Sequence, residues 1–498
     1  MGHLLDAGSL PGAAASATLT CGATARTLGE GSGVEQGDQV DKLLVISGDG
    51  HVTPPLGEIV GYLESPAREM VDQLVRDNWT FTESAVKPSR PSPALLERFD
   101  RRHLVRSGGE YGAAHAAIRL AQMDQEGIAG EIVHPHSQIN QSPFFTGHAD
   151  EARTAGARAY HRWLADFAAA CDHRIFPVAE PGPCHDMDAT IAELTWAREH
   201  GFVAVSAPGM MRSPDLPLLF DEHFEPFWSA VEDLGLVISV HAGYSGTGTN
   251  AVDHGELRAQ MDQEMMQQFA RVTDEDGLNF NALSDMMSVR GSAIRLGLQV
   301  PRRVMWQLMA GGVFDRHPRL KVALTEIRAD WVPGTLDHLA TRFEEQRVPC
   351  ELTPREYWER HFLVVPSSIH RSEVEMRHEI GVGQLGFGQD FPHWEGVWPD
   401  TLNWLQDAFG DVPEDEARAI LGTNAAAFYG LPVDRLSEVA ERIGPDPSDV
   451  LGDHPVDDDL IQYFHRRSGY LRPADPVYPE EIDQALDPDL APLSVPAI

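Results

Sequence analysis

The chain has 498 residues, 42% of them hydrophobic, and a formal net charge of −37 that results from 39 basic and 76 acidic side chains. This length is ample for a large buried core and suits either two or three domains or one α/β barrel with insertions. The acidity serves solubility, and it also repels nucleic acid and anionic membrane surfaces. We therefore expect a small-molecule substrate and neither a nucleic-acid nor a membrane partner.

Residues 1–42 are interpreted as a flexible N-terminal extension, because they contain an Ala-rich patch but neither the basic start nor the clear apolar run of a signal peptide. No run of 18 apolar residues is present, so the sequence predicts no membrane-spanning helix. The cysteines are scattered without a CxxC pair, which argues against a disulfide framework and fits a reducing cytoplasm. They are Cys21, Cys171, Cys184 and Cys350.

From about residue 43, short β-rich runs alternate with helical patterns, which is typical of βα units around a parallel sheet. Eight of these runs are predicted strands. They are LLVISGD (43–49), GEIVHP (130–135), RIFPVAE (174–180), FVAVSAP (202–208), GLVISVH (235–241), LKVALTE (320–326), HFLVVPS (361–367) and QLGFGQD (384–390). Amphipathic segments at 115–127, 188–201 and 221–235 each end in Gly, which is a helix C-terminal signal.

Eight strands with eight connections favour a closed (β/α)8 TIM-like barrel over an open sheet, and no GxGxxG motif follows the first strand. We assign the barrel domain to residues 43–431. Long insertions are expected after strand 1 (50–114) and after strand 5 (242–319), where the loops of a barrel build the active site. Residues 432–498 are rich in Pro and Asp, and we expect them to form an extended C-terminal arm.

Ionisable residues stand at the ends of four predicted strands. Strand 1 ends in Asp49 and, two residues later, His51, and residues at this spacing in an extended segment point to the same side. Strands 5, 6 and 8 end in His241, Glu326 and Asp390. Taken singly, each is more often a structural hydrogen-bonding group. Together on one barrel rim, they predict a site for zinc, manganese or iron.

Further polar and aromatic residues follow the strand ends. His393, three residues after Asp390, is either another ligand or an acid/base group near the metal. His134 and His136 at the end of strand 2 point the same way, and they either contact substrate, relay protons or have only a polar role at the rim. The apolar candidates for a substrate pocket, which suit rim packing equally well, are Phe144, Phe145, Trp394 and Trp398.

Several motifs in this order resemble the amidohydrolase-related family, which also contains metal-dependent aromatic decarboxylases. The resemblance runs from about residue 44 to 431 and includes the Asp-Gly-His start, RLAQMDQEGIAGEIVHP, GGVFDRHPRLKVALTEIRADWVPGTLDHLATRFE, FGQDFPHWEGVWPD and ILGTNAAAFYGL. It implies a barrel metal site made by Asp49, His51, His241 and Asp390. Because the family is often dimeric, it also implies a homodimer.

The sequence departs from the family in two ways. The decarboxylases usually have a His at the end of strand 6, where this chain has Glu326, and two-metal hydrolases often have a strand-4 Lys that VAVSAPG lacks. The extra carboxylate resembles the ligand sets of non-heme di-iron oxygenases. In this respect the chain is similar to a small branch of the family that consists of dinuclear iron, or manganese–iron, monooxygenases. One of these enzymes hydroxylates a diterpenoid in platensimycin-type antibiotic biosynthesis.

The resemblance therefore favours a dinuclear non-heme iron monooxygenase with two Fe2+ ions, which uses O2 to hydroxylate an apolar small molecule such as a diterpenoid. The alternative is a hydrolase or non-oxidative decarboxylase of a small carboxylated substrate. That enzyme would hold one divalent ion such as Zn2+ or Mn2+, with His393 or His134 as the acid/base group. A non-catalytic partner subunit is a third hypothesis, which the complete ligand set disfavours.

Overall fold

The computed structural model describes residues 42–54, 56–64, 68, 109–135, 150–208, 216–241, 273–274, 277–278, 302–393, 396–467 and 479–493. All of them belong to one compact unit, Val40–Ile498. The predicted N-terminal extension and most of both predicted insertions lie outside the described residues. The same is true of the pocket candidates His136, Phe144, Phe145 and Trp394.

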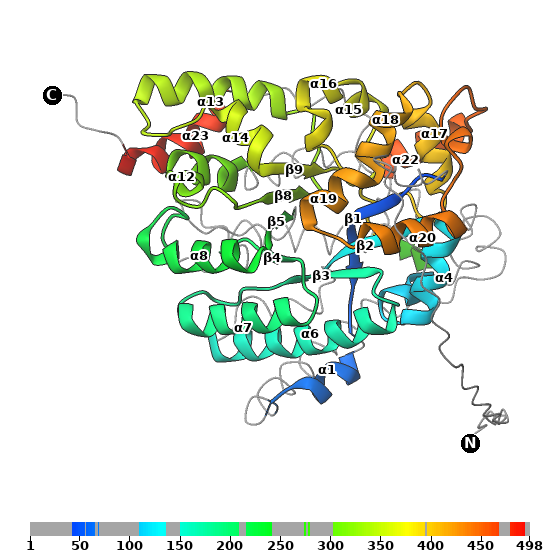
Figure 1. Ribbon diagram of the computed structural model, residues 1–498, viewed down its shortest axis with the longest axis horizontal. Coiled ribbons are helices and arrows are strands. Elements are labelled where there is room, and N and C mark those ends of the chain that lie inside the picture. Colours follow the sequence, from blue (N-terminus) through cyan, green and yellow to red (C-terminus); the bar gives the residue numbers. More distant parts are fainter. Residues whose placement is uncertain are drawn as a thin grey trace, which may run out of the picture. The chain divides into compact units, whose positions relative to one another are not determined.

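A parallel sheet of seven strands forms the centre of this unit, in the spatial order β1-β2-β3-β4-β5-β8-β9 (Figure 1). The strands are β1 (Val45–Val52), β2 (Ile128–Pro135), β3 (Ile175–Ala179), β4 (Ala204–Ser206), β5 (Val237–His241), β8 (Val322–Thr325) and β9 (Phe362–Val365). They confirm the first seven predicted strands to within a few residues. A separate antiparallel pair consists of β6 (Thr273–Asp274) and β7 (Gly277–Leu278).

The eighth predicted strand joins the two edges of the sheet. Parallel bridges link Leu385 to β9 and Phe391 to Gly50 of β1. The backbone N–H of Asp390 also donates to the carbonyl oxygen of Asp49 at 2.8 Å. This segment therefore lies between β9 and β1 through single bridges instead of a regular ladder, and the curled sheet is closed as a TIM-like fold requires.

Side chains that alternate along the strands divide between two hydrophobic clusters. One cluster fills the interior of the sheet and contains one alternating set of strand residues together with Leu436. Its strand members include Ile46, Ile132, Phe176, Val178, Ala204, Val237, Ala323 and Leu363. The other set, which includes Val133, Ala179, Val205 and Ile238, packs in a larger cluster with helix residues such as Trp163 and Trp228. This alternation determines which strand-end side chains face the interior.

Helices follow most of the strands and cover the outside of the sheet (Figure 1). The longer ones before residue 432 are α4 (Ala116–Glu126), α6 (Asp150–Ala170), α7 (Met187–Glu199), α8 (Glu225–Leu234), α13 (Val332–Gln346), α14 (Pro354–His361) and α17 (Thr401–Phe409). Three of them, α4, α7 and α8, confirm the helices predicted from the amphipathic segments. Gly127 and Gly235 adopt left-handed backbone conformations directly after α4 and α8, as a glycine C-cap does.

The expectation of an extended C-terminal arm is wrong, because the described residues after 431 are largely helical. They form α20 (Val433–Ile443), α21 (Pro447–Val450), α22 (Asp458–Arg467) and α23 (Pro479–Leu490). Pro447 and Pro479 stand in first helical turns, where proline is compatible with a helix, and Asp446 forms a capping box with Asp449.

Two contacts attach this C-terminal region to the barrel. Leu436 of α20 belongs to the interior cluster. The buried carboxylate of Asp489 in α23 accepts hydrogen bonds from Arg303, at 2.5 and 2.7 Å, and from Trp306 at 2.8 Å. The region therefore packs on the same chain's barrel.

Gly422 provides a test of how tightly the helices pack on β1. It lies in the π-helical turn Ala419–Thr423, and a Cβ there would be 1.9 Å from the carbonyl oxygen of Leu44, next to β1. We expect Gly422→Ala to lower the free energy of unfolding by about 3 kcal/mol, at the upper end of overpacking costs, because backbone atoms must move. Gly383→Ala is the control, since a Cβ at Gly383 meets nothing within 4 Å. Equal urea-unfolding midpoints for the two variants would contradict this packing.

The environment of Glu193 in α7 should make the free energy of unfolding depend on pH. It accepts hydrogen bonds from His161 Nδ1 (2.8 Å) and Arg162 Nη2 (3.0 Å) of α6. Burial favours its neutral form, but these two partners outweigh burial and lower its pKa from 4.5 to about 2. A depressed pKa in the folded state stabilises the fold above pH 4.5, and this stabilisation is lost as the pH falls toward 2.

We therefore expect Glu193→Gln to be less stable than the unmodified chain at pH 7, by about 2 kcal/mol after allowance for solvent screening. The difference should shrink steadily between pH 5 and pH 2. Thermal unfolding of both proteins across this range measures it. A constant difference would show that the carboxylate is not the source of the stabilisation.

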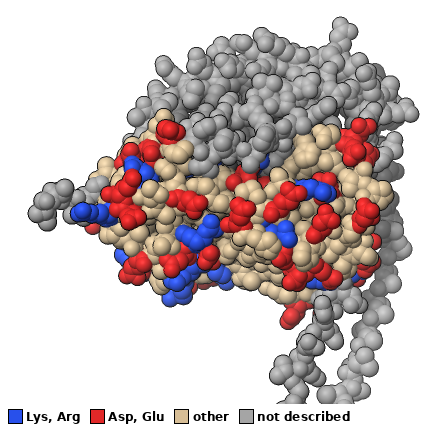
Figure 2. All heavy atoms as spheres, turned by 90° about the horizontal axis from the view of Figure 1, so that it is seen from above, with Lys and Arg blue, Asp and Glu red and all other residues tan. Residues whose placement is uncertain are grey.

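Asp and Glu side chains are spread over the visible face in Figure 2, with Lys and Arg side chains between them. The described surface in this view therefore shows no continuous basic patch of the kind that binds a nucleic-acid backbone. Among the helices that the structure describes, none combines the length and the apolar character needed to cross a membrane.

Candidate metal centre

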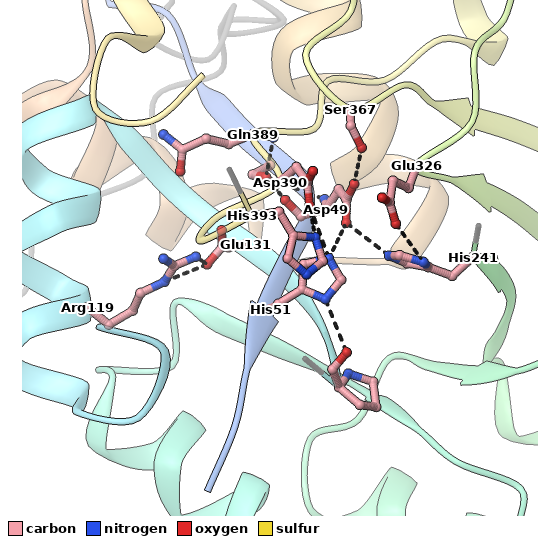
Figure 3. A network of polar contacts seen from close by, with 12 residues as sticks. Asp49, His51, Arg119, Glu131, His241, Glu326, Ser367, Gln389, Asp390 and His393 are labelled. Carbon is pink, nitrogen blue, oxygen red and sulfur yellow. Dashed lines mark hydrogen bonds and ion pairs between the residues drawn. The ribbon is translucent and has the colours of Figure 1, made fainter. Parts of the chain in front are cut away.

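All six predicted ligands meet where the parallel strands end, and Figure 3 shows them as one connected cluster. β1 contributes Asp49 and His51, and β5 ends in His241. Glu326 follows β8, and Asp390 and His393 follow the bridging segment. In contact order the cluster is Glu326, His241, Asp49, His51, Asp390 and His393.

His51 is oriented as a metal-binding imidazole. Its Nδ1 is 3.1 Å from the carbonyl oxygen of Pro135, and because a carbonyl only accepts, Nδ1 carries the hydrogen and donates it. Nε2 therefore faces two buried carboxylates, Asp49 Oδ1 at 3.3 Å and Asp390 Oδ1 at 3.2 Å. A ligand histidine typically donates its other ring N–H to a carbonyl in this way, which fixes the tautomer.

His241 lies between the carboxylates of Asp49 and Glu326 and contacts both. Its Nε2 is 3.3 Å from Asp49 Oδ1, and its Nδ1 is 3.1 Å from Glu326 Oε2. The second oxygen of Asp49 accepts a short hydrogen bond from the Ser367 hydroxyl. Asp49 therefore lies at the centre of the cluster, held from three directions.

His393 lies next to both Asp390 and His51. Its Nδ1 is 2.7 Å from Asp390 Oδ1, and its ring centroid is 3.9 Å from that of His51. Oδ2 of Asp390 is buried and makes no hydrogen bond to any described residue. A buried carboxylate oxygen in this state is costly unless a cation or a ligand satisfies it.

Two groups of side chains in the described part of the chain are arranged closely enough to hold a metal ion. Asp49, His51 and His241 form one, and His51, Glu326 and His393 form the other. Within each group the candidate ligand atoms lie within 4.8 Å of one another, and His51 belongs to both. Imidazole nitrogens and carboxylate oxygens together suit Zn2+, Mn2+ or Fe2+. The residues therefore fit a metal centre.

Burial and the carboxylates determine the protonation of the cluster. Burial opposes the charged form of His51, but contacts with Asp390 and Asp49 outweigh it and raise the pKa of His51 to about 10. Burial also opposes ionisation of Asp49, yet His241 and His51 hold its pKa well below the ordinary value. The carboxylates of Asp49 and Asp390 therefore favour a positive charge at His51, and a bound cation would benefit from the same attraction.

His134 at the end of β2 is also part of the cluster. Its ring centroid is 4.6 Å from that of His241 and 6.0 Å from that of His51. Burial first, and then the neighbouring His241, lowers its pKa well below 6.5, so the imidazole is neutral at neutral pH. Its Nε2 is buried and makes no hydrogen bond to a described residue.

Trp398 is the one pocket candidate within the described residues. It is buried, and its ring packs edge-on against Phe391 at 4.9 Å in a small cluster with Ala113. Its contact with substrate remains a prediction.

A buried ion pair behind β1 was not predicted from the sequence. The guanidinium of Arg119 in α4 donates to Glu131 Oε2 of β2 and lies 3.6 Å over the ring of Phe391. A Cβ at Gly50 would be 2.2 Å from Glu131 Oε1, so Glu131 packs directly against β1 between Asp49 and His51. The sequence feature that could have indicated this ion pair is Glu131 itself, a carboxylate inside an otherwise largely apolar strand that needs a buried partner.

Residues 103–431, well over half of the chain, match the family described as amidohydrolase. The chain belongs to the amidohydrolase family. A curated relative, γ-resorcylate decarboxylase from Rhodococcus jostii, is 24% identical over 262 residues, which are 50% of this chain and 69% of the relative. The matched residues 103–431 include His241, Glu326, Asp390 and His393, and Asp49 and His51 precede them.

Two solved structures show the same fold. A 5-carboxyvanillate decarboxylase from Novosphingobium aromaticivorans, crystallised with manganese, has a TM-score of 0.52 at 19% identity and covers 79% of this chain and 99% of its own. An amidohydrolase from Mycobacterium avium subsp. paratuberculosis has a TM-score of 0.50 at 18% identity and covers 78% and 99%. At this identity, the likeness extends to the fold alone.

Proposed function

We propose that this amidohydrolase-family protein is a metal-dependent enzyme that decarboxylates or hydrolyses a small carboxylated substrate without an external oxidant. The observation that carries the proposal is the buried set of Asp49, His51 and His241, with Asp390 beside it, at the carboxyl ends of the strands. Catalytic residues of barrel enzymes lie at this end of the strands. The decarboxylase relative supports the choice of reaction class.

In this proposal Asp49, His51, His241 and Asp390 hold one divalent ion. When bound, the ion supplies Lewis-acid polarisation of a substrate oxygen or of water. The neutral imidazole of His134 contacts a substrate oxygen through Nε2, which the described residues do not use. His393, hydrogen-bonded to Asp390, holds or releases a proton at the opposite side of the cluster.

Metal removal and reconstitution test this function. We expect the purified chain to contain about one divalent ion, a chelator to abolish activity, and Mn2+ or Zn2+ to restore it. CO2 release from γ-resorcylate and related aromatic acids, followed with and without O2, is the assay. Turnover that continues without O2 supports the proposal, and a chelator-insensitive activity would exclude it.

A second candidate function is that of a dinuclear non-heme iron monooxygenase acting on an apolar small molecule with O2. The specific observation in its favour is Glu326, which lies beside His241 and forms a second potential metal group with His51 and His393. Six ligands with three carboxylates exceed what one tetrahedral ion requires. In this function Glu326 and His393 would hold the second ion.

Metal stoichiometry separates the two functions. Two iron ions per chain, together with O2 uptake coupled to a hydroxylated product, would favour the monooxygenase. In that case Glu326→Gln should reduce the iron content to about one ion per chain. One ion per chain that is unaffected by Glu326→Gln, and O2-independent turnover, would exclude it.

A further inference from the structure

Two polar side chains occupy neighbouring strand ends that the metal cluster does not use. Glu180 directly follows β3, and Ser206 is the last residue of β4, two strands that pair side by side (Figure 1). The Ser206 hydroxyl donates to Glu180 Oε1 at 2.7 Å. Both side chains are nearly buried, with 3% of Glu180 and 8% of Ser206 exposed.

Strand alternation directs both side chains toward the interior of the barrel. Phe176 and Val178 of β3 belong to the interior cluster, and Glu180 continues their series two residues later. Ala204 of β4 is also an interior residue, and Ser206 follows it at the same spacing. The neighbouring Ala179, Val205 and Ala207 pack in the outer cluster with the helices.

This places the pair at the same end of the barrel as the metal cluster. Ser206 pairs in register with Ser239 of β5, and His241 follows Ser239 on the same face of that strand. The backbone of Glu180 is fixed as well, because its N–H donates to His161 Nε2 at 2.8 Å. The pair thus lies on the β3–β4 side of the barrel mouth, next to the strand that carries His241.

The Glu180 carboxyl has an unused hydrogen-bonding oxygen. Within the described part of the chain, Oε2 makes no hydrogen bond, and no Lys or Arg forms an ion pair with the group. Burial, which the Ser206 hydrogen bond only partly offsets, raises the pKa of Glu180 to about 7. At neutral pH the carboxyl can therefore either donate or accept a hydrogen bond. A buried carboxyl without a cation is costly as a purely structural element.

We propose that Glu180 and Ser206 form a hydrogen-bonding subsite that recognises a hydroxyl or carbonyl oxygen of the small-molecule substrate. The proposal rests on the proposed function, since it assumes that the substrate binds over the carboxyl ends of the strands. The pair determines specificity: it selects substrates that carry an oxygen on the β3–β4 side, away from Glu326 and Asp390.

Binding of matched pairs of acids tests this subsite. The probes are γ-resorcylate against benzoate, and 4-hydroxycyclohexanecarboxylate against cyclohexanecarboxylate, titrated calorimetrically into the full chain loaded with Mn2+. We expect the oxygen-bearing member of at least one pair to bind about tenfold more tightly. Glu180→Leu and Ser206→Ala should remove this preference and leave the affinity for the plain acid within about threefold. Glu180→Gln should retain part of it, because an amide also forms hydrogen bonds.

Glu373→Gln is the matched control. Glu373 is another buried carboxyl whose pKa burial raises to about 7, but it binds the backbone N–H groups of Ala329 and His370 instead of facing the mouth. Its substitution should lower the unfolding temperature without changing the preference. If the unmodified chain shows no preference in either pair, or if Glu180→Leu retains it, the subsite does not exist. Metal content and turnover of the unmodified chain test the proposed function separately, so the two failures are distinguishable.

Discussion

Asp49→Asn is expected to abolish metal binding and activity while leaving the metal-free fold intact. The substitution preserves the shape of the side chain but replaces a carboxylate oxygen with an amide that binds cations poorly. Loss of a residue that only orients a metal ligand typically costs 10- to 100-fold in metal affinity or activity, and Asp49 would be a direct ligand. We therefore expect kcat/KM to fall by about 1000-fold or more.

The position of Asp49 explains why its effect should exceed that of the other ligands. It contacts His51, His241 and Ser367, so it connects β1 to β5 and to the segment after β9. Any ion bound by the first ligand group must lie against this carboxylate. Loss of its charge therefore removes a ligand and the group that aligns two imidazoles.

The experiment compares the metal-induced rise in unfolding temperature with metal content. At a metal concentration 100 times the Kd, binding stabilises the unmodified chain by about 2.7 kcal/mol, and Asp49→Asn should lose this gain. His378→Ala, at an exposed histidine, is the control and should behave as the unmodified chain. If Asp49→Asn binds metal with unchanged stoichiometry and remains active, the proposed centre is wrong.

Arg119→Met is expected to cause the largest loss of stability. Arg119 and Glu131 are both almost completely buried, and removal of one partner leaves the other charge without compensation. Such losses typically cost about 3–5 kcal/mol. Burial favours the uncharged form of Glu131 and raises its pKa even with Arg119 present, so the pair has little surplus stabilisation.

A double-mutant cycle separates the ion pair from its surroundings. Replacing both partners, as in Arg119→Met with Glu131→Leu, should recover most of the lost stability, because two apolar side chains leave no buried charge. We expect the double variant to lie within about 2 kcal/mol of the unmodified chain in urea unfolding. If the double variant instead loses as much stability as the two single variants combined, the two side chains do not interact.

The variants of Arg119 and Glu131 can also be tested for their affinity for the metal ion. Glu131 packs against Gly50, and the ring under Arg119 belongs to Phe391, whose carbonyl accepts from the His51 N–H at 2.6 Å. Arg119→Met should therefore also weaken metal binding, through displacement of β1. Unchanged metal affinity in a destabilised variant would limit the pair to a role in folding.

The sequence predicts the strands well because the parallel sheet is buried on both faces, which gives compact β-rich runs separated by amphipathic helices. Gly127 and Gly235 likewise indicate helix ends, since a left-handed C-cap favours glycine. The cluster at the strand ends follows from the same logic, because the carboxyl ends of parallel strands share one rim.

Two features of the centre depend on geometry that alternation cannot provide. Thr325 continues the interior series of Ala323, so Glu326 would point outward if its backbone were extended. Instead Glu326 has a φ of 56°, and Asp390 a φ of 60°, a left-handed conformation uncommon outside glycine. These turns bring both carboxylates into contact with histidines of other strands.

Other features escape prediction because composition and periodicity do not show which polar side chains meet or which residues cap a helix. Arg119 and Glu131 belong to adjacent elements, but nothing in the sequence indicates that the two charges meet. The Pro and Asp content after residue 431 predicts extended chain, whereas Asp446, Pro447 and Pro479 occupy a cap and first turns, where they are compatible with helices. Composition alone does not distinguish the two positions.

The segment that closes the barrel has a consequence for the order of folding. The contact between Ser47 and Gln389 joins residues separated by 342 positions, and contacts of such separation form slowly. Asp49 and Asp390 lie on opposite sides of this junction. A nascent or partly folded chain in which the first five strands have paired therefore lacks two of the three carboxylates, Glu326 and Asp390. It contains only Asp49, His51 and His241 of the ligands proposed for the ion. The full ligand set is thus assembled only when the segment around Asp390 has closed the barrel.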